Sequence, residues 1–256
     1  MPNIFETISE AGKYQTDLAL CIIVKTHGST PRETGAKMLV FPDGRISGTI
    51  GGGELEKSVI EQALKVLKSG KPAFFRHDLL HQHNMCCGGS VDVYIEPIMK
   101  KKRLYIFGAG HTGHALAKLA VGLDFEIYII DDRKEYLDQI NIEGLSKMNL
   151  HYAQALPLLP FDDQTFVAIM TYSHPYDRDI LAFCLKKPHA YLGMIGSQRK
   201  VEMTKKMFEE AKIASLNELE TVDMPMGIDI NAESPEEIAI SILAKMIAVK
   251  NTVTRE

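Results

Sequence analysis

The sequence predicts an α/β protein, with a smaller N-terminal mixed α/β domain and a C-terminal domain built on a parallel sheet. After residue 103, short apolar strands alternate with helical segments, which is the pattern of a doubly wound sheet. A glycine-rich loop also joins a strand to a helix in each half of the chain. The basic run at 99–103 separates the two patterns, so we place the domains at residues 1–100 and 103–256.

The N-terminal domain is predicted to open with a short helix and to continue as strands around one long helix. Pro42, Asp43 and Gly44 are turn residues, so the strands that flank them form a hairpin. Apolar residues at helical spacing follow three consecutive glycines, and Gly70 with Pro72 ends this helix. The strands of this predicted mixed sheet lie at 18–24, 37–41, 45–50, around 74–75 and at 91–95, and the buried helix face holds Leu55, Val59, Ala63, Val66 and Leu67.

The C-terminal domain is predicted to alternate strands and helices up to a last, apolar helix. That helix begins at residues 234–237, a capping box with proline at the first helical position. Little of its circumference is polar, so we expect it to be buried against the other domain or a partner subunit. The predicted strands lie at 104–107, 125–130, 165–170 and 190–195, with a helix at about 177–185.

Composition and charge argue against several classes of protein. A net charge of −4 and a pI near 6.2 give no basic surface for nucleic acid or an anionic membrane. No apolar run reaches the roughly 20 residues that a membrane-spanning helix needs, and the N-terminus lacks a signal-type stretch, so we expect a cytoplasmic protein. Cys21 and Cys184 lie in apolar runs, and the adjacent Cys86 and Cys87 would form only a strained disulfide.

A glycine motif opens the C-terminal domain. Gly108, Gly110 and Gly113 follow a predicted strand and lead into a predicted helix, and Asp131 ends the next strand. This arrangement predicts a Rossmann-like turn, in which the helix start receives a phosphate and the acid receives a ribose. The alternative is that the glycines only allow helix and strand to pack closely. His111 could donate to a phosphate, contact a metal or simply be exposed.

Two further loops follow the strands predicted at 165–170 and 190–195, on what should be the same carboxyl edge of the sheet. Ligands of open α/β sheets bind at that edge. His174 and Asp177 are candidate catalytic residues, because a carboxylate can orient an imidazole for proton transfer. Asp177 alone would equally suit a helix cap.

Three consecutive glycines, Gly51, Gly52 and Gly53, precede the long helix of the N-terminal domain. Glycine lets the backbone curl so that its N–H groups surround an anion at the helix start. Arg32 is a candidate to bind the same phosphate. A flexible hairpin exit is the alternative, but three glycines cost more chain entropy than a turn requires, so we favour a ligand.

A Cys-Cys-Gly-Gly step, formed by Cys86, Cys87, Gly88 and Gly89, follows a segment with three histidines. The spacing matches none of the paired zinc arrangements, so we expect no structural metal site here. A glycine-flanked thiolate near histidines suits transient contact with a soft metal or the handling of sulfur. An inert turn thiol is the alternative.

Seven segments of the chain read, in order, GSTPRETGAKMLV, GTIGGGELE, CGGSVDVYIEP, GAGHTGHALAKLA, YSHPYDRDILAFCL, AYLGMIGSQRK and SPEEIAISILAKM. Together they resemble the xanthine dehydrogenase accessory factors of the XdhC type, from about residue 18 to residue 247. The resemblance implies a family-specific N-terminal domain, a Rossmann-like C-terminal domain and self-association as a homodimer.

The resemblance also implies a role in the maturation of molybdenum hydroxylases. It implies binding of the molybdenum cofactor, its protection while a cysteine desulfurase helps to install the terminal sulfido ligand, and its delivery to the apoenzyme. Cys87 matches the family's cysteine before Gly-Gly, whereas Cys86 is an addition without an assigned role. In the segment GIDINA at 227–232, Asn231 stands where the family commonly has glycine, which would disturb a contact that depends on glycine.

The residues and the resemblance combine in one hypothesis. Molybdopterin carries a phosphate and holds its metal through sulfur. Gly51, Gly52 and Gly53 with Arg32 would receive the phosphate, and Cys87 would approach molybdenum or the incoming sulfur. The alternative function is an NAD(P)-dependent oxidoreductase that uses the glycine loop at 108–113, and a scaffold acting through the last helix is a third possibility.

Overall fold

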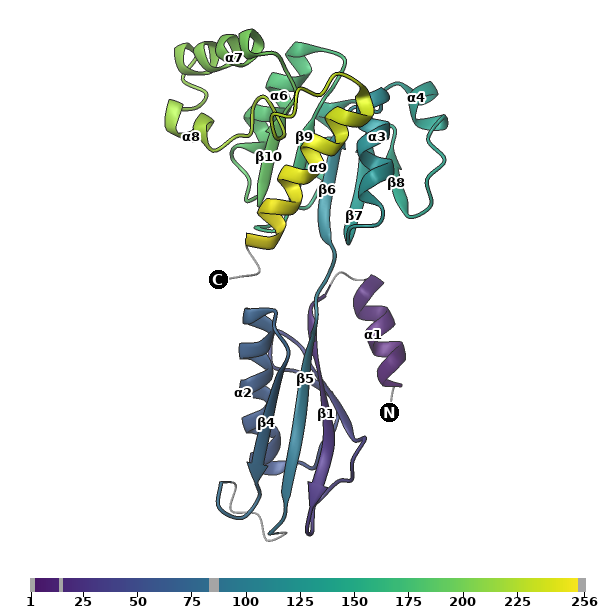
Figure 1. Cartoon of the computed structure of the whole chain (residues 1–256), viewed down its shortest axis with the longest axis vertical. Helices are drawn as coiled ribbons and strands as arrows, with labels where there is room; N and C mark the ends of the chain where they lie inside the picture. The colour runs from purple at the N-terminus through teal and green to yellow at the C-terminus, as the bar shows by residue number, and fades with distance from the viewer. Residues whose placement is uncertain (1–2, 14–15, 83–87, 253–256) are drawn as a thin grey trace. The chain divides into compact units, whose positions relative to one another are not determined.

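The computed structural model describes residues 3–13, 16–82 and 88–252 (Figure 1). The chain divides into two compact units, of which the first extends to Lys100 and the second begins at Lys101. Each unit has its own sheet and its own buried core. Within the described ranges, no helix combines the length and apolar character needed to cross a membrane.

The first unit contains a five-stranded sheet in the order β3-β2-β1-β5-β4. All neighbouring strands run antiparallel, so the prediction of a mixed sheet is wrong. The connections explain this, because β1 to β2, β2 to β3 and β4 to β5 have no helix between them, and a direct connection between neighbours reverses the chain. The strands are β1 (Leu18–His27), β2 (Lys37–Val40), β3 (Ile46–Gly48), β4 (Ala73–Asp78) and β5 (Ser90–Ile98).

Two helices cover opposite faces of this sheet (Figure 1). The apolar face predicted for α2 (Gly53–Ser69) is buried against the sheet. This helix ends at Gly70, whose left-handed φ of 63° confirms the predicted stop. On the other face, α1 (Ile4–Lys13) contributes Ile8 and Ala11 to a smaller apolar cluster.

The second unit contains a five-stranded parallel sheet in the order β10-β9-β6-β7-β8. Read from β8, this is the strand order of a Rossmann-like sheet, and the order reverses between β6 and β9. The prediction did not include β8, because this edge strand has only four residues, none of them fully buried. The strands are β6 (Lys102–Phe107), β7 (Phe125–Ile130), β8 (Leu145–Met148), β9 (Phe166–Ile169) and β10 (Tyr191–Met194).

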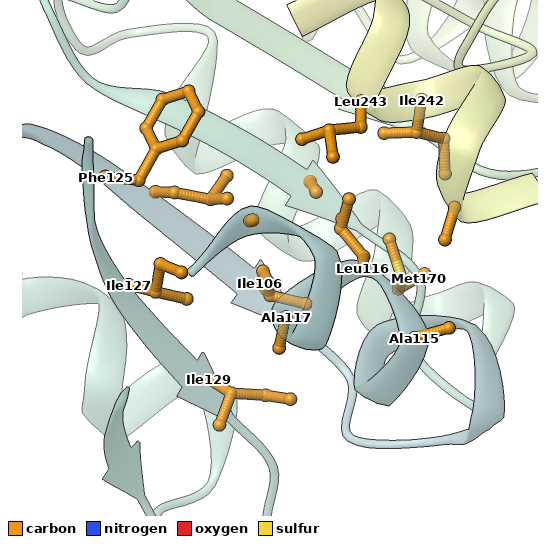
Figure 2. Packing of buried hydrophobic residues seen from close by; sticks show 14 of the residues in the cluster. Ile106, Ala115, Leu116, Ala117, Phe125, Ile127, Ile129, Met170, Ile242 and Leu243 are labelled. Carbon is orange, nitrogen blue, oxygen red and sulfur yellow. The ribbon is translucent and has the colours of Figure 1, made fainter. Parts of the chain in front are cut away.

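Helices cover both faces of the parallel sheet. On one face lie α3 (His111–Ala120) and α9 (Pro235–Thr252), and Figure 2 shows Leu116 and Ile242 among the side chains packed there. The other face is covered mainly by α5, a short 3-10 helix η1 and α6. The remaining helices of this unit are α4 (Lys134–Asp138), α5 (Tyr152–Ala155), η1 (Leu156–Leu158), α6 (His174–Cys184), α7 (Gln198–Glu210) and α8 (Leu216–Glu220).

The last helix, α9, begins as predicted but packs differently. The Ser234 backbone N–H donates to Glu237 Oε2 at 3.0 Å, and the Glu237 N–H donates to Ser234 Oγ at 3.3 Å. Its buried residues, including Ala239 and Met246, pack on α3 of the same unit. The helix is not buried all round as its apolar sequence suggests, because Ile240, on the side away from α3, is 51% exposed.

Candidate functional site

The glycine turn of the second unit lies between the end of β6 and the start of α3. A Cβ atom on Gly108 would overlap the carbonyl oxygen of Met170, and one on Gly113 would overlap the carbonyl oxygen of Gly108. The packing of β6, β9 and α3 therefore requires these two glycines. At Gly110 a Cβ would meet no atom within 4 Å, so this glycine leaves the backbone accessible at the helix N-terminus, beside the exposed His111.

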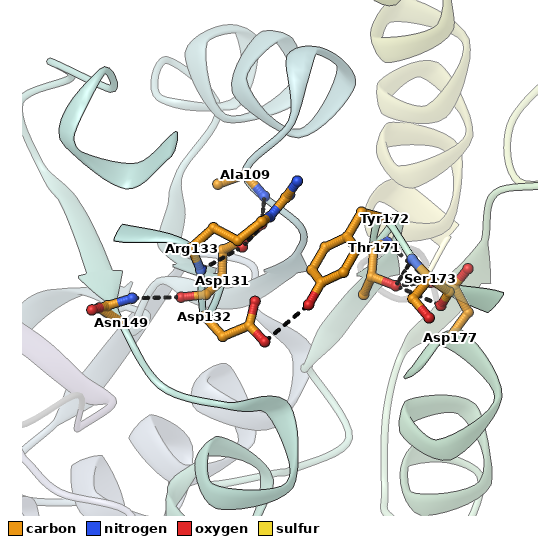
Figure 3. Close-up of polar contacts among 9 residues, drawn as sticks. All are labelled: Ala109, Asp131, Asp132, Arg133, Asn149, Thr171, Tyr172, Ser173 and Asp177. Carbon is orange, nitrogen blue, oxygen red and sulfur yellow. Dashed lines mark hydrogen bonds and ion pairs between the residues drawn. The ribbon is translucent and has the colours of Figure 1, made fainter. Parts of the chain in front are cut away.

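Asp131, the acid predicted to bind a ribose, is fully buried behind this turn (Figure 3). Its carboxylate accepts hydrogen bonds from the Ala109 N–H at 2.7 Å and the Arg133 N–H at 3.0 Å, and from Arg133 Nε and Nη2 at 2.9 and 2.8 Å. Burial raises the pKa of Asp131, but the hydrogen bonds from Arg133 and Ala109 outweigh it and lower the pKa overall. A carboxylate has about four acceptor sites, so Asp131 stabilises the turn and has no site left for a ribose.

The Arg133 guanidinium is held in place from two sides. Its Cζ lies 3.9 Å from the ring centroid of Tyr136 and 4.1 Å from that of Tyr172. Both distances are within the range of cation–π attraction. The two rings therefore help to keep the guanidinium on Asp131.

Asp177 connects the loop after β9 with α6 and α7. Its Oδ1 accepts from the Thr171 N–H at 2.9 Å and the Thr171 hydroxyl at 2.7 Å, and its Oδ2 lies 2.7 Å from Lys200 Nζ. The distance from His174 Nδ1 to Asp177 Oδ2 is 3.8 Å, and the His174 side chain is 71% exposed. The 3.8 Å distance exceeds hydrogen-bond distance, so Asp177 is held by a buried ion pair with Lys200 and makes no hydrogen bond that orients His174 in this structure.

Sequence reasoning did not identify Lys200 as the partner of Asp177. The signal was available in the segment after β10, since parallel strands place the loops after β9 and β10 at one edge of the sheet. Ser197 caps α7 by accepting a hydrogen bond from the Lys200 N–H at 3.3 Å, and Lys200 Nζ also donates to the Ile195 carbonyl at 2.8 Å. The Lys200 side chain is 13% exposed, so its ammonium group is bound mainly by Asp177 and the Ile195 carbonyl.

The three-glycine loop of the first unit surrounds an anion, and this anion is the side-chain carboxylate of Glu56. Glu56 Oε1 accepts from the backbone N–H groups of Ile50 at 3.0 Å, Gly51 at 3.3 Å and Gly52 at 2.9 Å, and also from the Thr49 hydroxyl. A ligand phosphate at Gly51 and Gly52 would have to displace this carboxylate. The phosphate-binding role predicted for these two glycines is therefore corrected, because an internal carboxylate already occupies their donors.

We expect Glu56→Gln to lower the free energy of unfolding by about 1–2 kcal/mol at pH 7, because a charged acceptor of several hydrogen bonds becomes a neutral one. Burial raises the pKa of Glu56, but the bonds from Thr49, Gly52 and their neighbours lower it overall. The stabilisation is thus present above the unfolded glutamate pKa of about 4.3 and is lost as the pH falls through the lower folded value.

Urea unfolding of both proteins at pH 7 and at acidic pH checks the role of Glu56. The difference between wild type and Glu56→Gln should shrink as the pH falls. Glu61→Gln, an exposed change on the same helix, is the matched control and should leave the unfolding midpoint nearly unchanged. A Glu56→Gln protein as stable as wild type at pH 7 would contradict the role of this carboxylate.

The loop at 28–32 is contacted by both glycine steps of the first unit. A Cβ on Gly51 would overlap the Pro31 ring, and one on Gly89 would overlap the carbonyl oxygen of Ser29. Ser29 also forms an isolated bridge with Gly88. These contacts place Ser29 and Pro31 beside the two glycine steps, at the end of the sheet where β1 ends and β5 begins. Arg32 follows Pro31 on this loop and is exposed.

Cys86, Cys87 and His83 lie outside the described residues. Of the other two histidines in this segment, His77 is buried with Nε2 3.1 Å from Gln62 Oε1, and His81 is exposed. Cys21 and Cys184, which lie in apolar runs of the sequence, are free and buried, and burial raises the pKa of each thiol to about 12. These two thiols are therefore unsuited to ligand chemistry.

No group of three or more His, Cys, Asp or Glu side chains in the described part of the chain is arranged to hold a metal ion. The segment at 227–232 contributes to the wall of a cavity of about 350 Å³. Asn231 has a left-handed φ of 54° there, a conformation that asparagine tolerates better than most residues. The backbone conformation that glycine would adopt is therefore available to Asn231.

A parallel sheet in Rossmann order, with an accessible glycine at its first turn, defines the second unit as a Rossmann-like domain. The sequence profile of the XdhC Rossmann domain matches residues 104–246, and that of the XdhC and CoxI family matches residues 13–78. The chain therefore belongs to the XdhC and CoxI family, which is associated with the maturation of xanthine dehydrogenase.

Several known proteins are similar to this chain. The uncharacterized protein YqeB of Escherichia coli (strain K12) is 36% identical over 97% of the chain and 46% of its own length. A probable xanthine dehydrogenase subunit from Bacillus subtilis (strain 168) is 27% identical over 64% of the chain and 48% of its own length. The chain thus spans about half the length of these curated relatives.

A solved structure shares the fold. A Bacillus halodurans protein, described as a xanthine dehydrogenase, has a TM-score of 0.53 and 22% sequence identity to this chain. The similarity covers 97% of this chain and 96% of the other. At this level of identity the comparison supports the fold alone.

Proposed function

We propose that this protein binds the molybdenum cofactor and supports its sulfuration and its insertion into a molybdenum hydroxylase apoenzyme. The cofactor is a cargo here, and the partners are the apoenzyme, a cysteine desulfurase and a second copy of the chain. Membership of the XdhC and CoxI family supports this assignment. The similarity to a probable xanthine dehydrogenase subunit from Bacillus subtilis also supports it.

The observation that carries the proposal is the convergence on the loop at 28–32. Gly88, which directly follows Cys87 in the sequence, bridges to Ser29, and Arg32 lies three residues further along the same loop. A thiolate is a suitable ligand for a metal that is also bound by sulfur, and an arginine guanidinium can bind a phosphate through two hydrogen bonds. We assign Cys87 to molybdenum or its incoming sulfur and Arg32 to the phosphate, without the Gly51 and Gly52 amides that Glu56 occupies.

Metal analysis of the purified protein tests this function. We expect molybdenum to copurify with wild type from cells that make the cofactor. The molybdenum content should fall at least about tenfold in Cys87→Ala. Loss of a residue that only supports a metal ligand typically lowers metal affinity about 10–100-fold, and loss of the ligand itself should lower it no less. Mass spectrometry of the same samples should detect molybdopterin.

Cys86→Ala is the matched control, since it removes the neighbouring thiol and leaves Cys87 in place. It should retain the metal. Molybdenum bound equally by wild type and Cys87→Ala would remove Cys87 from the site, and a wild-type protein free of molybdopterin would contradict the cargo itself.

The NAD(P)-dependent oxidoreductase remains less favoured as a function. Its proton relay would need His174 and Asp177 within hydrogen-bond distance, whereas Asp177 is paired with Lys200. Its ribose acid, Asp131, has all its acceptor sites occupied. An oxidoreductase would also give no role to Cys87.

A further inference from the structure

Strand β4 forms one edge of the sheet in the first unit, where the strand order ends beside β5 (Figure 1). The register of this pair continues past the strand, since the Leu79 N–H donates to the Gly89 carbonyl at 2.9 Å. Residues of an antiparallel strand alternately bond to the neighbouring strand and point away from it. Counting back from Leu79, the residues that direct their backbone N–H and C=O groups away from β5 are Phe74, Arg76 and Asp78.

The outward backbone groups of Phe74 and Arg76 are open. Asp78 already has partners, because its N–H donates to Gln82 Oε1 at 2.9 Å and its carbonyl accepts from the Gln82 N–H at 3.1 Å. The backbone groups of Phe74 and Arg76 that face away from β5 have no hydrogen-bond partner within residues 3–13, 16–82 and 88–252. Phe74 is 68% exposed, and the Arg76 side chain is 69% exposed. An open edge of this kind is a template for a further strand.

A second copy of β4 fits this edge. Two identical strands related by a two-fold axis pair antiparallel, and each outward-facing residue must then meet an outward-facing residue. An axis at Phe75 meets this condition, because it places Phe74 opposite the partner's Arg76 and Arg76 opposite the partner's Phe74. Each of these two pairs exchanges two backbone hydrogen bonds, so all the open groups are used.

The neighbouring positions of the axis are less favourable. An axis at Arg76 would place two arginines directly opposite each other, and like charges in that position are destabilising. It would also place Phe74 opposite Asp78, whose backbone groups are already bonded to Gln82. An axis at Phe74 would place Arg76 opposite Pro72, which has no N–H to donate. The strand therefore favours the register with Phe75 at the axis.

The side chains also match in this register, because residues opposite each other lie on the same face of a sheet. Phe74 contacts Tyr94, with the ring centroids 4.9 Å apart, so the partner's Arg76 would lie beside aromatic rings, where cation–π attraction is favourable. The Arg76 guanidinium is available, because its Nε is 3.8 Å from Asp92 Oδ1, beyond hydrogen-bond distance. On the other face Phe75, which packs against the core beneath α2, would meet the partner's Phe75.

We propose that the chain self-associates through β4, with Phe75 of each copy at the two-fold axis and Phe74 opposite the partner's Arg76. The two five-stranded sheets then form one continuous sheet. This inference rests on the self-association included in the proposed function, and it identifies the surface that mediates it. It involves neither Cys87 nor the loop at 28–32.

Analytical ultracentrifugation of the full chain tests this edge. Wild type should dimerise at concentrations up to about 100 µM, since an interface built around one pair of strands is small and binds weakly. Arg76→Pro should weaken the dimer at least about tenfold, because it removes one outward N–H and one cation from each copy. This variant should fold, because the Arg76 N–H points away from β5 and proline is tolerated at such edge positions.

Two alanine variants separate the cation from the backbone. Arg76→Ala keeps the outward N–H and should weaken the dimer less than Arg76→Pro does. Arg45→Ala removes another exposed arginine of the first unit and should leave the dimer unchanged.

Oxidative cross-linking tests the register, in a chain that also carries Cys86→Ala and Cys87→Ala. Phe75→Cys should form a disulfide between two copies, because residues opposite each other at such a position have Cα atoms about 4.5 Å apart, which a disulfide can span. Phe74→Cys, one residue away, faces the partner's Arg76 and should cross-link several-fold more slowly.

The outcomes distinguish this interface from self-association in general. A folded Arg76→Pro that dimerises as tightly as wild type, or a Phe74→Cys that cross-links as fast as Phe75→Cys, would overturn the interface and leave self-association through another surface. A wild type that is monomeric at every concentration would overturn both. The molybdenum content of the purified protein tests the cargo separately.

Discussion

Replacing Asp177 with alanine should lower the free energy of unfolding of the second unit by about 3–5 kcal/mol, the usual cost of removing one partner from a buried ion pair. The change leaves Lys200 Nζ without the carboxylate at 2.7 Å. It also removes the acceptor for the Thr171 N–H and hydroxyl. The loops after β9 and β10 would then lose the bonds that join them. Urea unfolding followed by circular dichroism, with hydrogen exchange to assign the loss to the second unit, measures the effect.

Two controls distinguish this ion pair from a general effect of charge. Asp138→Ala removes a surface ion pair between Asp138, which is 61% exposed, and Lys134, which is 70% exposed. This change should lower the free energy of unfolding by no more than about 1 kcal/mol. The double variant Asp177→Ala with Lys200→Met should recover part of the stability, because no unpaired buried charge remains. A loss below that of Asp138→Ala would show that Asp177 does not hold these loops.

Replacing Gly113 with alanine should lower the free energy of unfolding of the second unit by at least about 3 kcal/mol, at the upper end of the cost of overpacking. The new Cβ would overlap the carbonyl oxygen of Gly108. Backbone at the end of β6 cannot move aside without disturbing its bonds, such as that from the Met170 N–H to the Phe107 carbonyl at 2.9 Å. The unfolding midpoint in urea is the measurement.

Gly110→Ala is the matched control three residues earlier. Its Cβ would enter open space, and its φ of −67° suits any residue. We expect a cost of at most about 1 kcal/mol, the difference between glycine and alanine at a helix N-cap. If Gly113→Ala were as stable as Gly110→Ala, the close approach of α3 to β6 would not depend on this glycine.

Much of the second unit could be predicted from local patterns. Alternating apolar strands and helical segments indicated the parallel sheet, and the glycine motif identified the turn between β6 and α3. The capping box at Ser234 and Glu237 marked the start of α9. These features were accessible because each depends on residues within one or two helical turns of one another.

The direction of strands in the first unit was less accessible. Apolar alternation predicts a strand but says nothing of its neighbour, so the antiparallel order with β5 between β1 and β4 had to come from the structure. The packing of α9 on α3 also had to come from the structure. Its sequence shows that much of the helix is apolar, and the residues that cover it are more than 100 positions away.

At the candidate sites, too, the sequence indicated which groups take part and the structure decided which of them interact. The glycines at 51–53 correctly indicated backbone donors around an anion, but the anion is Glu56, a residue of the helix that follows. The acid at Asp131 was also recognised, yet Arg133 and Ala109 use its acceptors. A sequence shows which groups can donate and accept. It does not show which of them meet.

The amino-acid order alone was enough to indicate the family, most of the strands and the position of the Rossmann-like turn, because ordered motifs, short-range periodicity and glycine spacing encode them. Three-dimensional packing decided the pairing of Asp177 with Lys200 and the occupation of the Gly51 loop by Glu56. Hydrogen bonds and ion pairs form over about 3 Å, so they depend on how distant segments are brought together in the folded chain.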